Sequence, residues 1–231
     1  MRYFVLLLSC LACIGQPFNP TVASWGGSTA VAAFDPTNIA GLYFQYSYKD
    51  FVVGQSVSNW NEKILSGSTR SLTNVVSAKW PTNSASGVFF NASWLTNGSP
   101  STATSNFSVW ISMTPTATPS GYHCLFSDSA GNRGFEIHAG VIDFFATTDH
   151  NMAAVTANVQ VDFVYANGAS YTNGVAGATI VPPTGNSTVG SVGSDSVNEN
   201  YDGYIKYLYI WTNTILTSAQ AVSLHTYGAA N

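Results

Sequence analysis

The stretch that decides the fold is YDGYIKYLYIW, residues 201–211, which runs into ILTSAQAVSLHTYG, residues 215–228. The first segment starts at a glycine and alternates aromatic with aliphatic residues, so it predicts a β-strand. In the second segment Thr217 and Gln220 form a capping box, and apolar residues follow at helical spacing. Gly228 is placed to end this helix in a left-handed cap. A short helix that plugs one end of a sandwich is therefore expected directly after the last strand.

Upstream of these segments the pattern is that of a β protein. Short apolar and aromatic runs recur between turn residues, and no amphipathic helix of useful length precedes Thr217. Asn167-Gly168 predicts a tight type I′ hairpin turn, and Ala139-Gly140 predicts a second turn between residues 135–138 and 141–145. Short strands at fairly regular spacing indicate a sandwich or barrel.

The composition limits the kinds of binding partner that the chain can be expected to have. The chain has 231 residues, which suits one all-β domain, with 45% hydrophobic but only 8% charged residues. Serine, threonine, asparagine and glycine replace the missing charges, as in many secreted β proteins and viral surface proteins. The net charge is −4, and seven basic residues are spread over the whole length. No nucleic-acid partner is expected, because no basic patch is available to meet a phosphate backbone.

The chain divides into three predicted parts. Residues 1–15 read as a secretory signal peptide cleaved after Gly15, or alternatively as an apolar arm, and the apolar run is short for a membrane span. Residues 16–33 read as a linker or arm, and residues 34–231 as the β-sandwich. The mature chain is then expected to lack a membrane span and to be secreted or displayed on a virion surface. It would keep one cysteine, Cys124, as a small buried apolar residue.

A family resemblance rests on the order of several weak motifs between residues 34 and 227. They are VSNWNEK at 57–63, the strand and Asn-Gly pair at 162–168, Asp-Gly-Tyr-Ile at 202–205, and Leu-Thr at 216–217. This order resembles laminin-G-like domains, which belong to the concanavalin A-like lectin and glucanase superfamily. The resemblance implies a jelly-roll β-sandwich of two antiparallel sheets with one short C-terminal helix. It is most similar to examples in virus and phage surface proteins and bacterial exoproteins.

An enzyme is not expected, although the same fold carries glucanases. Those relatives place their catalytic carboxylates on one strand as Glu-x-Asp-x-Glu. This chain has three glutamates, Glu62, Glu136 and Glu199, and none stands in that pattern. No zinc-spaced cluster, phosphate loop or nucleophile elbow is present either. A glycoside hydrolase therefore remains only a distant alternative.

One constellation of polar residues can be built from the predicted hairpin at Ala139-Gly140. Glu136 and His138 would share one face, and Glu136 would lie directly opposite Asp143. Two facing carboxylates repel unless a cation, a shared proton or ample water relieves them. The sequence thus offers Glu136, His138 and Asp143 as a candidate metal or ligand site. The alternative is a solvated outer face with no ligand.

The family resemblance also implies Ca²⁺ as the candidate cofactor. Related domains often bind the ion at one rim, and Asp128, Asp195 and Asp202 lie in glycine- and serine-rich loops that supply oxygen ligands. The alternative is that these aspartates cap turns with their own side chains. Four sequons are candidate N-glycosylation sites on surface loops, at Asn91, Asn97, Asn106 and Asn186.

Two non-catalytic functions follow from this reading. The first is a surface-displayed structural component of a virion, such as a capsid decoration or fibre, or of an extracellular appendage. Its partners would be other copies of the chain or shell proteins. The alternative is a secreted, lectin-like adhesin whose partners are cell-surface glycans.

Overall fold

The computed structural model describes residues 33–61, 63, 71–73, 80–96, 106–117, 120–128, 133–145, 150–182, 189–194 and 199–231. The chain separates into two units, Met1–Ala33 and Phe34–Asn231, and all the helices and strands described below belong to the second. Glu62, Asn97, Asn186, Asp195 and the predicted signal peptide lie outside the described residues.

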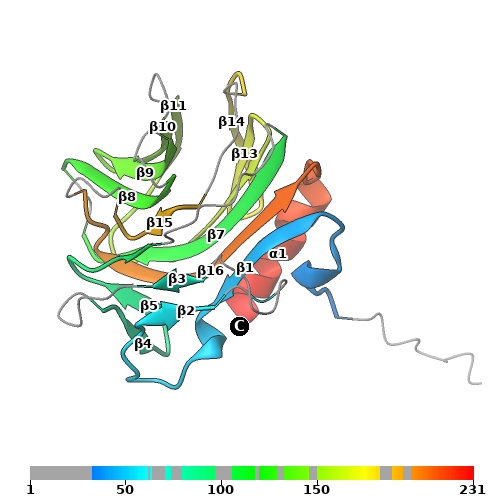
Figure 1. Ribbon diagram of the computed structural model, residues 1–231. Coiled ribbons are helices and arrows are strands. Elements are labelled where there is room, and N and C mark those ends of the chain that lie inside the picture. The colour runs from blue at the N-terminus through cyan, green and yellow to red at the C-terminus, as the bar shows by residue number, and fades with distance from the viewer. Residues whose placement is uncertain are drawn as a thin grey trace, which may run out of the picture. The chain divides into compact units, whose positions relative to one another are not determined.

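Two antiparallel sheets make up the described β structure (Figure 1). The first sheet contains, in spatial order, β14 (Val175–Thr179), β13 (Ala169–Thr172), β12 (Val161–Ala166), β7 (Phe107–Pro115), β16 (Gly203–Thr212), β5 (Gly87–Phe90) and β4 (Thr82–Ser84), with β1 (Leu42–Ser47) also paired to β16. The second contains β11 (His150–Ala154), β10 (Val141–Phe145), β9 (Gly134–His138), β8 (Tyr122–Ser127), β15 (Ser191–Val192), β6 (Leu95–Thr96), β3 (Leu72–Thr73) and β2 (Asn59–Trp60).

Two 3₁₀ turns, η1 (Pro36–Asn38) and η2 (Tyr48–Asp50), flank β1, and one helix, α1 (Ser218–Ala230), closes the described chain. The predicted β-sandwich with a single C-terminal helix is confirmed. Both predicted turns also form as tight hairpins. Asn167 and Gly168 join β12 to β13, and Ala139 and Gly140 join β9 to β10, all with positive φ. Such angles match the twist of the flanking strands.

β7 and β16 are the longest strands and pair along most of their length. Leu208 lies opposite Ile111 and points into the sandwich, whereas Tyr209 lies opposite Trp110 and points outward. The register shifts between Ile205 and Tyr207, which inserts one extra residue. This bulge sets the alternation that sends aliphatic residues inward and aromatic residues outward along the rest of β16.

Two apolar clusters follow from this alternation. The larger lies between the sheets and includes Phe44, Trp60, Phe126, Phe135 and Tyr165. The smaller lies on the outer face of the first sheet and is built around Trp110, Tyr207, Tyr209 and Trp211. Both clusters are rich in aromatic rings, which bury a large area per residue.

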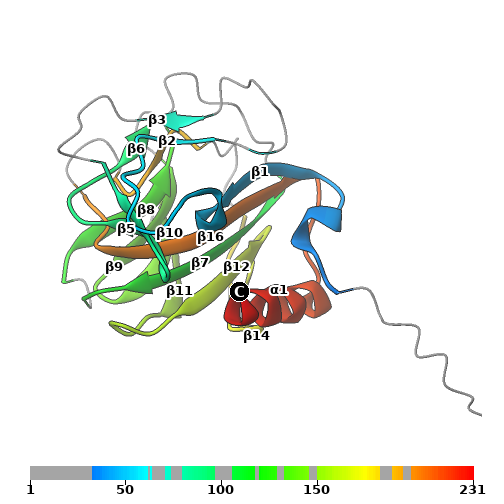
Figure 2. The same cartoon turned by 90° about the horizontal axis from the view of Figure 1, so that it is seen from below.

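Helix α1 covers the smaller cluster, close to β12 and β14 (Figure 2). Its predicted capping box is present, because Thr217 N donates to Gln220 Oε1 at 2.9 Å and Gln220 N donates to Thr217 Oγ1 at 3.2 Å. Ala221 and Leu224 are buried against the sheet. The helix therefore packs on a sheet face, and the expectation that it plugs an end of the sandwich is wrong.

Gly228 does not end the helix, which continues to Ala230. Its carbonyl accepts from Gln160 Nε2 at 3.2 Å, and His225 Nδ1 lies 2.9 Å from Asp162 Oδ2. A Cβ atom at Gly228 would collide with Asp162 Oδ1 and lie 3.1 Å from Trp110 Cζ2. The glycine is required for close approach between helix and sheet, which explains why a cap at this position was the wrong prediction.

We expect Gly228→Ala to lower the free energy of unfolding by about 1–3 kcal/mol, because the added methyl group overpacks this contact. Thr226→Ala, at an exposed position of the same helix, is the matched control and should change stability by less than about 0.5 kcal/mol. Urea unfolding followed by tryptophan fluorescence measures both. Equal stabilities for the two variants would contradict the close-approach role.

The buried tyrosines predict loss of stability in alkali. Burial raises the pKa of Tyr165 to about 12 and also raises the pKa of Tyr201, Tyr207 and Tyr209. In the unfolded chain tyrosine ionises near about pH 10. Stability is therefore complete below that pH and is lost as the pH rises toward the folded-state pKa. Each tyrosine contributes a slope of about 1.4 kcal/mol per pH unit in this window.

Urea unfolding at pH 9, 10, 11 and 11.5 tests this expectation. The midpoint should fall steadily above pH 10. A midpoint that stays constant up to pH 11.5 would show that these hydroxyls do not resist ionisation in the folded protein.

Candidate functional site

The hairpin of β9 and β10 carries the predicted cluster in the predicted register. Glu136 pairs with Asp143, and His138 pairs with Val141. Phe135 and Phe144, which alternate with them, lie in the core between the sheets. Glu136, His138 and Asp143 are therefore on the outer face of the second sheet, because neighbouring strand residues point to opposite faces.

Two further residues join them from the flanking strands. Tyr122 of β8 pairs with His138, and Asn151 of β11 pairs with Asp143. We call Tyr122, Glu136, His138, Asp143 and Asn151 the outer-face cluster. Its members come from four adjacent strands, so a single sheet surface positions all five side chains.

The cluster has an exposed layer and a buried layer. Tyr122 is 43% exposed and the His138 side chain 35%, whereas Glu136 is 3% and Asp143 0% exposed. The expectation that this face is simply solvated is wrong for the two carboxylates. Burying charged groups is costly unless hydrogen bonds or partners compensate.

Asp143 lies beneath two polar groups of the exposed layer. With the Asn151 amide nitrogen facing the carboxylate, it donates to Asp143 Oδ1 at 2.6 Å and to Oδ2 at 3.2 Å. His138 Nδ1 lies 3.7 Å from Asp143 Oδ2. The Asn151 carbonyl oxygen is consequently directed away from the carboxylate, where it can accept a hydrogen bond from a ligand.

The exposed rings form a stacked pair. The ring centroids of Tyr122 and His138 are 3.9 Å apart with an interplanar angle of 19°. His138 thus contacts Tyr122 on one side and approaches Asp143 on the other. The result is a ring platform beside an amide, and the buried Asp143 carboxylate holds the amide in place from below.

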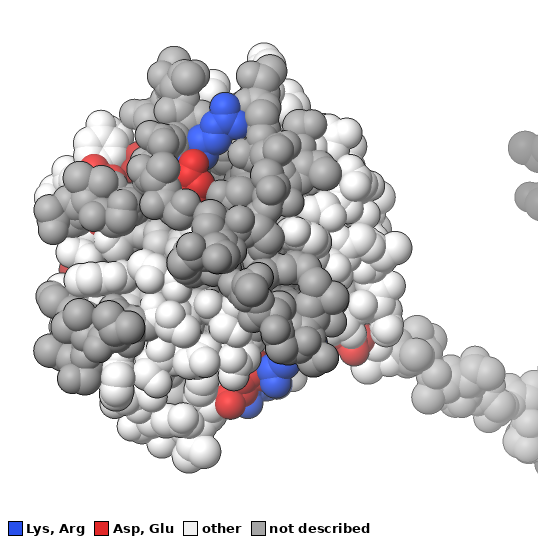
Figure 3. Space-filling view, in the orientation of Figure 1, with Lys and Arg blue, Asp and Glu red and all other residues white. Residues whose placement is uncertain are grey.

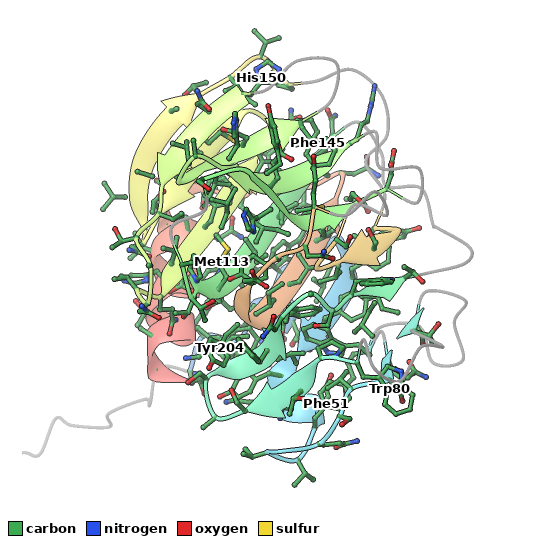
Figure 4. All side chains as sticks on the ribbon, turned by 90° about the vertical axis from the view of Figure 1, so that its left-hand side faces the viewer. Phe51, Trp80, Met113, Phe145, His150 and Tyr204 are labelled. Carbon is green, nitrogen blue, oxygen red and sulfur yellow. The ribbon has the colours of Figure 1, made fainter. Side chains whose placement is uncertain are left out.

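Charged residues make up only 8% of the chain. On the face drawn in Figure 3, most described atoms belong to uncharged residues. Figure 4 shows Phe145 and His150 at the end of the molecule formed by β10 and β11, with Trp80 and Phe51 toward the opposite end.

The other predicted aspartates do not join the cluster. Asp128 follows β8 at the end opposite Tyr122, and its backbone N–H donates to the carbonyl of Arg133. Asp202 precedes β16 in the other sheet, and its Oδ1 accepts from Ala92 N at 3.3 Å. This is a contact with a residue distant in sequence, not the local turn cap that the alternative describes. Among the residues that the structure describes, no group of three or more His, Cys, Asp or Glu is arranged to hold a metal ion. The Ca²⁺ site stays a prediction.

The structure also describes Cys124 and two of the four predicted glycosylation sites. Cys124 is buried, as its apolar character predicts. It pairs with Glu136 across β8 and β9. Asn91 and Asn106 are exposed beside strand ends. Their glycosylation stays a prediction. Within the described part of the chain, no helix has the length and apolarity that a membrane span requires.

Sequence reasoning missed Tyr122 and Asn151. The signal that could identify them is strand register, because each residue lies directly opposite a predicted member of the cluster. Neither pairing can be predicted by counting residues, because the register shifts once between β8 and β9 and once between β10 and β11.

Comparison with solved structures finds the same fold in carbohydrate-active proteins. Trypanosoma rangeli sialidase matches with a TM-score of 0.58 at 12% identity, over 81% of this chain and 33% of the sialidase. Its complex with sialic acid matches with a TM-score of 0.54 over the same shares. This chain thus spans about a third of the sialidase, and the likeness establishes the fold alone.

A second likeness covers a whole domain. Domain 4 of AbnA, a GH43 extracellular arabinanase from Geobacillus stearothermophilus solved with arabinotriose, matches with a TM-score of 0.51 at 15% identity. The match covers 80% of this chain and 98% of that domain. No protein-family model matches the chain, and no curated protein matches it by sequence.

These comparisons contradict the first predicted function. The sialidase and the arabinanase domain are carbohydrate-active proteins, not components of virions or appendages. The expectation of a structural particle component with shell-protein partners is therefore wrong, and glycan binding, the alternative, fits the comparisons better. The likenesses support the β-sandwich fold, whereas no family model supports the laminin-G-like type.

We expect Asn151→Ala to lower the free energy of unfolding by about 1–2 kcal/mol, because buried Asp143 loses a charge-assisted hydrogen-bond donor. Thr156→Ala, at an exposed position just beyond β11, is the control and should be nearly neutral. Denaturant unfolding compares the two variants. A neutral Asn151→Ala would show that the amide does not compensate the carboxylate.

Proposed function

We propose that this protein is a non-catalytic, secreted carbohydrate-binding module of laminin-G-like type, and that the outer-face cluster is its glycan site. The observation that carries the proposal is the exposed Tyr122–His138 stack beside the Asn151 amide, above a buried carboxylate. Its partners are cell-surface glycans or extracellular polysaccharides. The match to nearly all of an arabinanase domain solved with arabinotriose supports the same class of ligand.

The groups of the exposed layer suit the two kinds of surface that a sugar presents. The C–H face of a pyranose or furanose ring is apolar and packs on an aromatic ring, a role for the 43%-exposed ring of Tyr122. The hydroxyls need donors and acceptors, which Asn151 and His138 supply. Asp143 holds the Asn151 amide from beneath, and stacking on Tyr122 orients His138, so both groups lose little conformational freedom on binding.

The same geometry favours binding over hydrolysis. A retaining glycosidase needs two carboxylates that reach the glycosidic bond from either side. Glu136 and Asp143 are buried beneath the rings, with 3% and 0% of their surface exposed. Their role in this proposal is to orient the exposed layer.

The proposal predicts that Tyr122→Ala weakens glycan binding by about 5- to 150-fold, because a stacking ring contributes about 1–3 kcal/mol in comparable contacts. Tyr204→Ala, which removes a ring paired with Phe89 on the other sheet, is the matched control and should bind as wild type. A glycan array followed by calorimetry with arabinotriose or the best array ligand provides the measurement, with and without EDTA.

The outcomes separate clearly. Loss of binding in Tyr122→Ala alone supports the site. Equal loss in Tyr204→Ala would move the site to the first sheet, and a blank array with wild type would overturn the function itself. Loss of binding in EDTA would support the predicted Ca²⁺ site.

A further inference from the structure

The outer face of β10 carries a further aromatic ring beyond the outer-face cluster. Phe145 is the last residue of β10 and stands two positions after Asp143, so both side chains leave the same face of the sheet (Figure 4). The preceding residue, Phe144, points the opposite way and packs against three rings of the core. Among the described residues, Phe145 is half-buried and belongs to neither apolar cluster. Its ring is therefore available to contact a ligand on the same face as the cluster.

The strand beside Phe145 leaves its ring uncovered on that side. Phe145 pairs with Gly134 of β9, which has no side chain. A Cβ atom at Gly134 would collide with the backbone oxygen of Phe126, so the close approach of β8 and β9 requires glycine at this position. The packing of the sheet thus places no side chain directly opposite Phe145 on β9.

The register of the hairpin sets the distance between Phe145 and the stack of Tyr122 and His138. His138 lies opposite Val141, and Phe145 is four residues further along β10, which corresponds to about 13 Å at the usual rise per residue. Tyr122 lies on β8, two strands away from β10 and about 10 Å to the side. The stack and Phe145 are therefore about 13–16 Å apart, and Asn151 is level with the middle of this interval.

This spacing matches a short chain of sugars. A sugar ring built from single bonds of about 1.5 Å advances a glycan chain by roughly 5 Å. About three to four linked units therefore span the interval, whereas a disaccharide reaches an aromatic ring at one end only. The Asn151 amide lies where it can hydrogen-bond hydroxyls of the units between the two ends.

We propose that the glycan site is elongated, that it binds internal segments of linear oligosaccharides, and that Phe145 is its second stacking ring. The inference rests on the proposed function and deepens it, because it names chain-forming polysaccharides, not single terminal sugars, as the ligand class. Tyr122 stacks on one unit, and Phe145 stacks on a unit about two or three further along the chain. Once the first unit is bound, the second contact forms within the same complex and adds to the affinity.

The first experiment uses the full chain and no mutation. Calorimetry with arabinose and linear arabino-oligosaccharides of two to five units measures Kd against chain length, and the same series of another backbone replaces them if a glycan array selects one. We expect Kd to fall by about 5- to 150-fold between two and four units, because a second stacking ring is then engaged. Little further change is expected between four and five units.

The second experiment assigns the length dependence to its residue. Phe145→Ala removes the ring, and Phe145→Leu removes its aromatic face while keeping apolar bulk. Both should abolish the gain between two and four units and leave Kd for the disaccharide unchanged. Phe89→Ala, which removes a half-buried ring from the first sheet, is the matched control and should keep the wild-type length dependence. Circular dichroism establishes that the variants are folded, and Phe145→Leu together with the wild-type series provides the test if Phe145→Ala is not.

The outcomes distinguish the two proposals. Equal Kd values of wild type for two and four units overturn the elongated site while leaving glycan binding intact. A length dependence that survives in the Phe145 variants, or that is lost equally in Phe89→Ala, overturns the role of Phe145. Failure of wild type to bind any glycan overturns the proposed function and the elongated site with it.

Discussion

The pairing of β7 with β16 is the constraint on which the rest of the structure depends. These two strands occupy the middle of the first sheet, and their shared register decides which side chains of both strands turn inward. A slip by one residue would exchange the two faces, moving Leu208 outward and Tyr209 inward. The bulge after Ile205 fixes this choice. The interior between the sheets and the aromatic surface beneath α1 both follow from it.

Much of the fold could be predicted from local pattern. The aromatic strand, the capping box at Thr217 and the two positive-φ hairpins are encoded within a few residues each, so the sequence indicates them directly. The position of α1 is different. Whether a short helix covers a face or plugs an end depends on contacts with residues far away in sequence, such as Trp110. The close approach at Gly228 belongs to the same class, because the atoms that exclude a Cβ lie on other strands.

The candidate site shows the same division. Glu136 and Asp143 could be placed opposite one another, since a two-residue turn fixes the register of a hairpin. Their burial could not be foreseen, because it depends on neighbouring strands whose register the sequence does not set. Tyr122 and Asn151 come from those strands. Function was the hardest property to predict from the sequence, because a chain with few charges and many hydroxyl groups is equally compatible with particle assembly and with sugar recognition.

Asn231 lies beside the first sheet, whereas the outer-face cluster belongs to the second. Tyr48 and Lys49, next to β1 of the first sheet, both hydrogen-bond to it, whereas the cluster is on the outer face of the second sheet. The thickness of the sandwich therefore separates the two. A label or solid support attached at the Asn231 side chain would therefore leave the ring platform facing away from the attachment point.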